Sequence, residues 1–325
     1  MNPLTRALFG PWDVRPEVAL VLGTLTAIYL VGWFRLRRQG RVKLANRWRL
    51  AAYLGGMGLL AVSLMSPVDM LGGQLLFMHM IQHMVPIMVC APLIWLGNPF
   101  PIGLWGLPAR LRRSATLFFA GNSPFRRALA AATQPGIVWM VFIFVYIGWH
   151  DATLYNLALR RSCVHDLQHL TFFATALLYW WHVTNAGPRL HKRLPIWAVL
   201  VFLLAAVPPN AIAGVVIANS SQVIYTYYES VPRIWGFSAL QDQMIGGVIM
   251  WIQGSEMFIQ AAIIVVAYYW WKEGRKAKAE GRDINPQPGT EIPDEALIAP
   301  GLEHRAVQNR FRQAQEMRPK ATGAP

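Results

Sequence analysis

The residues best suited to chemistry in this sequence are two histidines, His79 and His83, inside a long apolar run over residues 75–96. On a helix this spacing places both imidazoles on one face, roughly 6 Å apart along the axis. Imidazole is a common metal ligand, and an ionisable group at membrane depth is usually functional. A second pair, His165 and His169, repeats the spacing. If both pairs reach one level of a membrane, they predict a shared metal or cofactor site.

The composition is that of a membrane protein. Hydrophobic residues make up 54% of the chain and charged residues only 14%, whereas a soluble domain carries about 25% charged residues. The net charge of +14 is spread over loops between apolar runs, which argues against a nucleic-acid partner. Two cysteines, Cys90 and Cys163, are too few for a disulfide framework, and Cys90 fits a small packed hydrophobe.

Seven apolar runs predict an all-α fold of seven transmembrane helices, because each run is near the roughly 20 residues that cross a bilayer core. Balanced charge precedes the first run and positive charge follows it, which favours a permanent span over a cleaved signal peptide. Residues 1–271 are predicted as one transmembrane domain, and residues 272–325 as a mostly disordered, basic cytoplasmic tail. The predicted spans are residues 18–34, 50–66, 75–96, 135–150, 165–185, 195–218 and 244–271.

The charge of the short loops predicts the orientation. With the N-terminus outside, the loops on the cytoplasmic side carry fifteen basic residues and the outer segments carry five. Basic residues favour the cytoplasmic side of a membrane. The N-terminus is therefore predicted outside and the C-terminus in the cytoplasm. The basic cytoplasmic loops are residues 35–49, 110–127 and 189–193.

This orientation brings five histidines to one level near the outer surface. The two pairs lie in the outer parts of the third and fifth predicted spans, and His150 lies at the outer end of the fourth. A single histidine at a helix end is often a satisfied interfacial residue, as His150 could be. Buried imidazoles cost free energy unless they find partners, so two pairs at one depth favour a bound metal or cofactor. The predicted metal ligands are His79, His83, His150, His165 and His169.

Other polar and thioether side chains lie near this level or within the spans. All-imidazole ligation suits copper, zinc, iron or nickel, and nearby thioethers favour copper(I). Carboxylates can orient ligating imidazoles from a second layer. Asp69, Asp166, Asp242 and Met244 are the accessory candidates, although packing alone also explains a methionine. Glu256 lies near the membrane midplane, where it is protonated, paired or part of an ion relay.

Four blocks of sequence resemble a known family, the CtaG-type (caa3-type) cytochrome c oxidase assembly factors of bacteria. The blocks cover about residues 50–270 in the family's order, and they are specific as a set. They are His79 to Met84, Trp149 to Tyr155, His165 to Leu170, and Asp242 to Trp251.

The resemblance implies a multi-pass protein of the bacterial plasma membrane that is not an enzyme. It further implies a role in maturing a haem–copper oxidase by helping copper reach its sites. Oxidase subunits or copper chaperones would be its partners, besides the lipid bilayer. Carried over by position, the metal-handling residues are the five histidines with Asp242 and Met250.

The chain also departs from the family pattern. Gln168 and Asn156 stand where the family often has acids, and His182 where it often has Pro. The loss of two carboxylates makes the site less anionic, which bears on its choice of metal.

Two other functions fit the same residues. A b-type membrane cytochrome would use histidines on different spans as axial haem ligands. The paired spacing argues against this reading, because axial ligands to one haem face each other. A copper or proton transporter would use Glu256 and the proline-interrupted sixth span.

Overall fold

The protein is described here by a computed structural model of residues 14–119, 123–188 and 190–280. These residues form helices and connecting loops, with no strand among them. Most of the predicted tail, residues 281–325, lies outside the described residues. The chain separates into one unit that ends at Val266 and another that begins at Ala267. In the second unit, Arg275 lies over the ring of Trp271, with 5.1 Å between the guanidinium carbon and the ring centroid.

The helices follow the predicted apolar runs. The first three runs correspond to α2 (Pro16–Arg38), α3 (Arg47–Met65) and the continuous stretch α5 (Leu76–Met84), η1 (Val85–Cys90) and α6 (Ala91–Leu96). The later ones correspond to α10 (Pro135–Trp149), α12 (Ser162–Thr184), α13 (Ile196–Leu204) with α14 (Val207–Ala218), and α15 (Ala239–Val248) with η3 (Ile249–Gln253) and α16 (Gly254–Ala279). Shorter helices connect them: α4 (Pro67–Gly72), α7 (Pro99–Gly106), α8 (Ala109–Phe118), α9 (Pro124–Ala132), α11 (Ala152–Arg160) and η2 (Thr226–Glu229).

By length and composition, five described helical stretches could cross a membrane. They correspond to the first, second, third, sixth and seventh predicted spans. The fourth passes only when α10 is taken together with α9, to which it is bent by 57°. The fifth, α12, has 23 residues but is less apolar than the others, because its first half carries the polar residues of the second histidine pair. The helix of the seventh run continues past residue 271, where the transmembrane domain was predicted to end.

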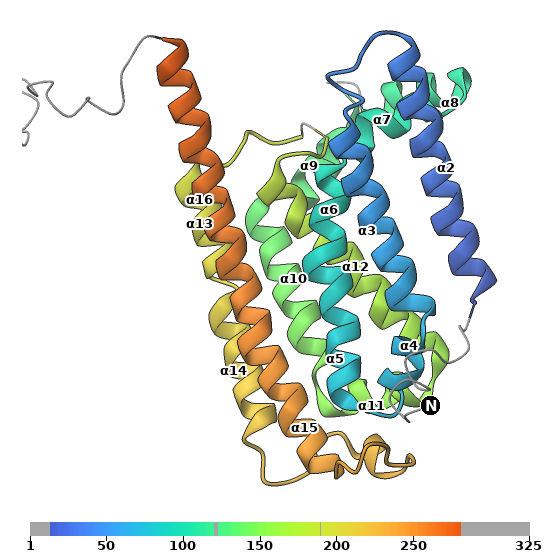
Figure 1. Cartoon of the computed structure of the whole chain (residues 1–325), viewed down its shortest axis with the longest axis vertical. Helices are drawn as coiled ribbons and strands as arrows, with labels where there is room; N and C mark the ends of the chain where they lie inside the picture. The colour runs from blue at the N-terminus through green and yellow to red at the C-terminus, as the bar shows by residue number, and fades with distance from the viewer. Residues whose placement is uncertain (1–13, 120–122, 189, 281–325) are drawn as a thin grey trace, which may run out of the picture. The chain divides into compact units, whose positions relative to one another are not determined.

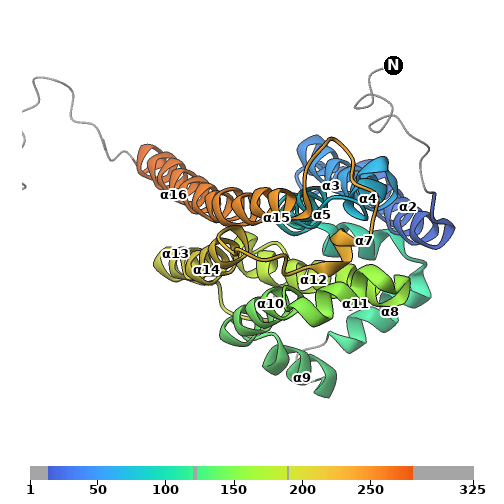
Figure 2. The same ribbon diagram turned by 90° about the horizontal axis from the view of Figure 1, so that it is seen from below.

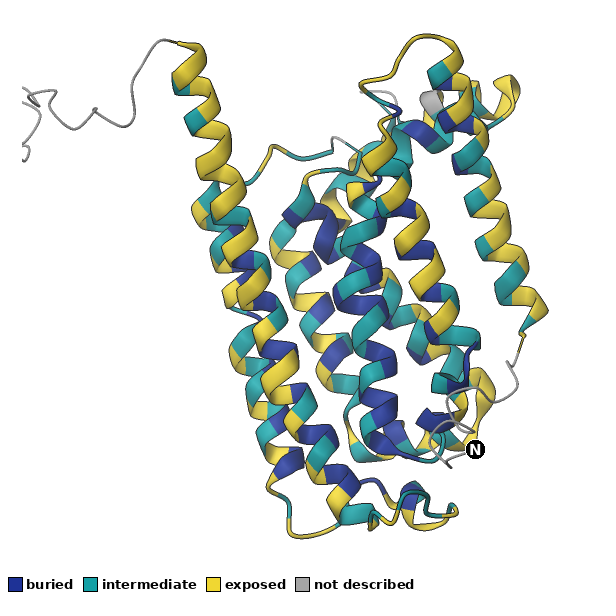
Figure 3. Ribbon diagram, viewed as in Figure 1, coloured by how far each residue is buried: buried dark blue, intermediate teal, exposed yellow. Residues whose placement is uncertain are grey.

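The third stretch, α5–η1–α6, lies at the centre of the first unit. It packs against α3, α12 and α15, and Figures 1 and 2 show it enclosed among them. Of its most apolar window 56% is buried, against 17% for α2 at the edge. Figure 3 shows the same contrast. The first histidine pair is therefore carried by the most enclosed helix of the unit.

Prolines interrupt two of the spans. Pro86 is the second residue of the wider π-helical turn η1, which follows the first histidine pair. A proline has no N–H for the regular helical bond. In the sixth span, Pro208 and Pro209 cannot bond back to the preceding turn, and the helix breaks at Ala205–Ala206. The carbonyl of Phe202 then accepts hydrogen bonds from the Tyr179 hydroxyl at 2.9 Å and from the Trp139 ring nitrogen at 3.1 Å. These bonds tie α10 and α12 to the broken helix.

Glycine permits the close approach of α14 to α15 and η3. A methyl group at Gly247 would lie 2.5 Å from the backbone nitrogen of Ala218, and one at Gly214 would lie 2.6 Å from that of Trp251. Such distances are shorter than any van der Waals contact, so only glycine fits at either position. Small residues are the usual means of close helix approach in membranes.

This contact gives a first prediction. Gly247→Ala is expected to lower stability by about 1–3 kcal/mol, because the added methyl overpacks the helix contact. Gly58→Ala is the matched control, since nothing lies within 4 Å of a methyl group there. The measurement is the midpoint of thermal unfolding in detergent. Equal midpoints for the two variants would contradict the close packing of α14 and α15.

Candidate functional site

A buried carboxylate fixes the start of the helix that carries the first histidine pair. Asp242 of α15 is fully buried and accepts hydrogen bonds from the backbone N–H groups of Leu76 at 2.9 Å and Phe77 at 3.0 Å. These donors begin α5, where no intrahelical acceptor exists. Arg233 neutralises the same carboxylate at 3.0 Å. Asp242 thus sets the position of α5, and the structure does not bring it to the imidazoles as a ligand.

The two histidine pairs face each other across α5 and α12. The ring centroids of His79 and His165 are 5.2 Å apart, and those of His83 and His169 are 4.7 Å apart. Within the pairs the spacings are 4.3 and 4.4 Å. Four imidazoles from two helices therefore form one cluster, which the i,i+4 spacing alone could not establish.

The cluster contains nitrogen atoms without a protein partner. His79 and His83 are almost fully buried, and the Nε2 atom of each has no hydrogen-bond partner. Leaving such an atom buried and unpaired costs about 1–3 kcal/mol. On the other helix, the Nε2 atoms of His165 and His169 lie 3.2 Å apart, within hydrogen-bond distance of each other. Lone pairs concentrated in this way are expected where a metal ion binds.

A carboxylate completes one side of the cluster. Asp69 of α4 lies with His165 and His169 such that one ligand atom of each falls within 4.8 Å of the others. The side-chain amide of Gln82 donates to Asp69. These three potential ligands are half-buried, whereas the first histidine pair is buried. The cluster therefore has an inner pair of imidazoles and an outer group of two imidazoles and a carboxylate.

His150, the fifth predicted ligand, lies one aromatic ring away from the cluster. Its ring contacts those of Tyr155 and Phe172, which in turn contact His79 and His83 respectively. Its Nδ1 atom lies 2.6 Å from the carbonyl oxygen of Tyr146. The structure thus places His150 beside the four paired histidines and not in ring contact with them.

The remaining candidate residues lie elsewhere. Asp166 pairs with Arg15 at 2.6 Å, at the head of α2, and this hydrogen bond raises the pKa of Arg15 above its usual value. Met244 is 47% exposed, and Met250 is buried in the main core. Glu256 is on the exposed face of α16, where it accepts a hydrogen bond from Gln260. None of these side chains is brought into the histidine cluster.

Two more histidines form a separate pair near the other end of α12. The Nε2 atoms of His182 and His191 each lie 2.9 Å from an oxygen of Thr133. Because their ring nitrogens find protein partners, they differ from the buried pair in α5. His304 lies outside the described residues.

Sequence reasoning missed three residues at the site. Gly72 lies against α5, and a methyl group there would be 2.8 Å from Gln82 Oε1 and 3.3 Å from the Cα of His79. Tyr155 is buried between His79 and His150, and Arg15 reaches the first turn of α12. Tyr155 belongs to one of the four motif blocks, which could have identified it. Nothing in the local sequence indicates the other two contacts.

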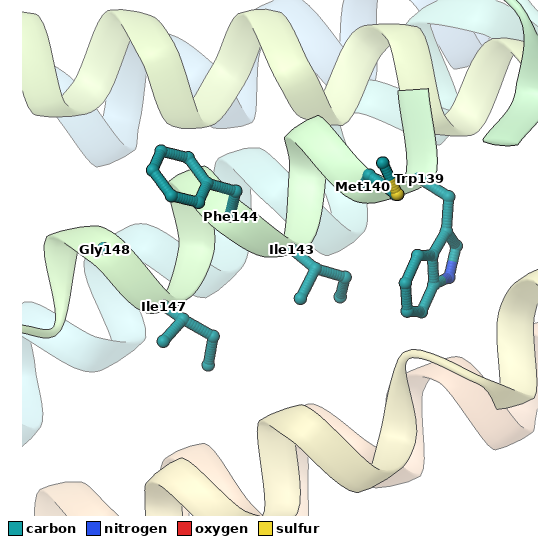
Figure 4. A pocket seen from close by; sticks show the side chains of 6 residues that line it. All are labelled: Trp139, Met140, Ile143, Phe144, Ile147 and Gly148. Carbon is teal, nitrogen blue, oxygen red and sulfur yellow. The ribbon is translucent and has the colours of Figure 1, made fainter. Parts of the chain in front are cut away.

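A groove of about 430 Å³ lies on another face of α10. Figure 4 shows Trp139, Ile143 and Ile147 projecting from one side of this helix into it. Its lining is apolar and includes no histidine, cysteine or carboxylate. The groove is therefore not the histidine site.

The residues of the cluster fit a metal ion. Two nitrogens that bind one ion at tetrahedral angles are about 3.3 Å apart, close to the 3.2 Å between the Nε2 atoms of His165 and His169. The unpaired Nε2 atoms of His79 and His83 and the nearby Asp69 add further ligand atoms. Imidazole with few carboxylates suits copper, zinc, iron or nickel more than magnesium or calcium.

The buried cap of α5 gives a second prediction. Asp242→Ala is expected to lower stability by about 3–5 kcal/mol, because it removes the counter-charge of Arg233 and leaves two backbone N–H groups unpaired. The matched control is Asp151→Ala, which removes an exposed carboxylate that also caps a helix through two N–H groups. That loss should cost only about 1 kcal/mol. Thermal unfolding midpoints measure both, and a loss for Asp242→Ala no larger than for the control would contradict the role of the cap.

Comparison with known proteins identifies related sequences. The sequence model of the cytochrome c oxidase caa3 assembly factor family matches residues 27–273. Two relatives are each 27% identical over 305 residues: uncharacterized protein Mb0105 of Mycobacterium bovis and uncharacterized protein MT0111 of Mycobacterium tuberculosis. The match covers 84% of this chain and 44% of each relative, so the chain spans less than half of their length. No solved structure matches the chain.

Proposed function

Because the chain belongs to the cytochrome c oxidase caa3 assembly factor family, we propose that it binds copper at the histidine cluster and helps deliver it to the oxidase. One observation carries this proposal: four imidazoles from α5 and α12 converge, and two of them have buried Nε2 atoms without a protein partner. Copper is the cargo and no bond in a substrate changes, so the role is not enzymatic.

The two halves of the cluster suit the uptake and release of an ion. His165, His169 and Asp69 are half-buried and form the entry side, while His79 and His83 form the enclosed side. The distances between the rings of the two pairs are short enough for ligands to exchange stepwise. The hydrogen bond from Gln82 orients the Asp69 carboxylate beside the outer pair. His150 lies one aromatic ring away from the inner pair and serves as an additional ligand during transfer.

We propose seven spans with the N-terminus outside, in the bacterial plasma membrane. The helices α10 and α12 support this count, because α10 is apolar throughout and α12 has 23 residues and packs against the central stretch. The helices α8 and α9, which carry the basic residues of 110–127, lie at the end of the unit opposite α4 and α11 (Figure 1). Since basic loops favour the cytoplasm, the histidine cluster beside α4 and α11 faces outward.

The ring spacings favour a metal ion over haem. Neighbouring imidazoles of the cluster have centroids 4.3–5.2 Å apart. The diagonal pair, His83 and His165, is 6.4 Å apart. His79 and His169 lie within 4.3–5.2 Å of both these rings, so they would occupy the space that a porphyrin plane between them needs. The alternative of an ion path through Glu256 gains no support either, because that side chain points out of the unit.

The copper proposal gives a third prediction. His83→Ala/His169→Ala should weaken copper binding by more than about tenfold, because it removes one imidazole from each helix of the cluster. The measurement is the copper content of purified protein after equilibration with a copper(I) buffer. The same variant, expressed in place of the native chain, should reduce the activity of the copper-dependent oxidase.

His182→Ala serves as the control, because it removes a buried histidine of the same helix whose ring nitrogen already has a protein partner. It is expected to retain the copper content of the unaltered protein. Equal copper content in the double variant and the control would contradict the proposed site. So would full oxidase activity in cells that carry only the double variant.

A further inference from the structure

A row of polar side chains lies on the exposed surface of a predicted transmembrane helix. Gln253, Glu256 and Gln260 follow one another at three and four residues, so they share one face of η3 and α16. All three are exposed. Gln260 Nε2 donates to Glu256 Oε1 at 2.7 Å. Glu256 lies at the middle of the apolar run 244–271, so this polar row is at the depth of the lipid chains.

Lipid chains offer neither a hydrogen-bond partner nor a counter-charge to these polar side chains. An ionisable residue inside a membrane almost always faces protein or a water-filled cavity, because an unpaired charge in hydrocarbon is costly. The hydrogen bond from Gln260 occupies only part of the acceptor capacity of the carboxylate. No Lys, Arg or His ion pair forms with Glu256 among the described residues. A further donor is therefore expected from outside the described part of the chain.

The exposed apolar residues beside the row have the spacing of a helix-packing seam. Ile252, Ile259 and Ile263 are exposed, and together with Glu256 they follow a pattern of four, three and four residues. This pattern places one stripe of side chains against a neighbouring helix, and a single polar residue within it fixes the register. The opposite face of α16, with Gly254, Ser255 and Phe258, is already buried in the unit.

We propose that this stripe docks a transmembrane helix of a different protein, one that carries a lysine or arginine at mid-membrane depth. Charge complementarity with Glu256 selects a cation. A second copy of this chain does not supply one, because the described spans carry Lys and Arg only near their ends. Two copies in the same orientation would instead place Glu256 against Glu256, which like charges disfavour.

The stripe lies apart from the histidine cluster, so partner binding and metal binding would use different surfaces. Glu256 lies outside the histidine cluster, and its side chain points away from the unit. A docked helix would hold this protein beside its partner without contact with the copper ligands. The proposal does not depend on copper, and it stands or fails separately from the proposed function.

The test measures association in liposomes between the full-length protein, labelled at the exposed Cys163, and synthetic helices of about 20 leucines. One helix carries a central lysine, a second a central asparagine, and a third only leucine. Energy transfer should show the lysine helix binding about tenfold better than the leucine helix. Glu256→Leu should abolish this preference, and Gln253→Leu/Gln260→Leu should reduce it.

Glu256→Gln provides a readout that loss of folding would not produce. It removes the charge and keeps hydrogen bonding, so the preference should move from the lysine helix to the asparagine helix. The copper content of each variant, measured in parallel, should match that of the unaltered protein if the histidine site binds copper. Equal binding of all three helices, a lysine preference that survives Glu256→Leu, or self-association of the protein through the stripe would each overturn the proposal.

Discussion

The site depends on the two hydrogen bonds and the ion pair that the Asp242 carboxylate forms. The carboxylate accepts two backbone hydrogen bonds at the start of α5 and is neutralised by Arg233, so α5 and α15 are joined at a buried point. This contact sets where α5 begins, and therefore where His79 and His83 lie relative to α12. A carboxylate in this position stabilises the helix through its N-terminal N–H groups and dipole. It places the helix that carries two of the four histidines of the proposed copper site.

The buried imidazoles have the opposite effect on the stability of the fold. Polar atoms enclosed among apolar helices lower stability unless they gain a partner. The fold supplies partners for His182 and His191 through Thr133, yet leaves Nε2 of His79 and His83 without one. A bound cation would remove this cost where the protein supplies no hydrogen bond. The difference between the two histidine groups therefore supports the proposal that the first group binds a metal ion.

Much of this arrangement could be predicted from the sequence. Long apolar runs predicted the helices, because crossing a bilayer requires length and hydrophobicity, and the i,i+4 spacing predicted that each histidine pair shares a face. The family resemblance is confirmed by the match over residues 27–273. The sequence could not show that Asp242 caps α5 or that Asp166 pairs with Arg15, since these contacts join residues more than 150 positions apart. Nor could it show that Glu256 faces outward, which depends on how η3 and α16 pack.

X-ray absorption spectroscopy of the copper-loaded protein tests the central claim most directly, because it reports the atoms bound to the metal. The account predicts a shell of nitrogen or oxygen ligands with the outer scattering that imidazole rings produce. The intensity of that scattering should fall when His83 and His169 are both replaced. A shell dominated by sulfur, or one without imidazole scattering, would contradict a copper site built by the histidines of α5 and α12.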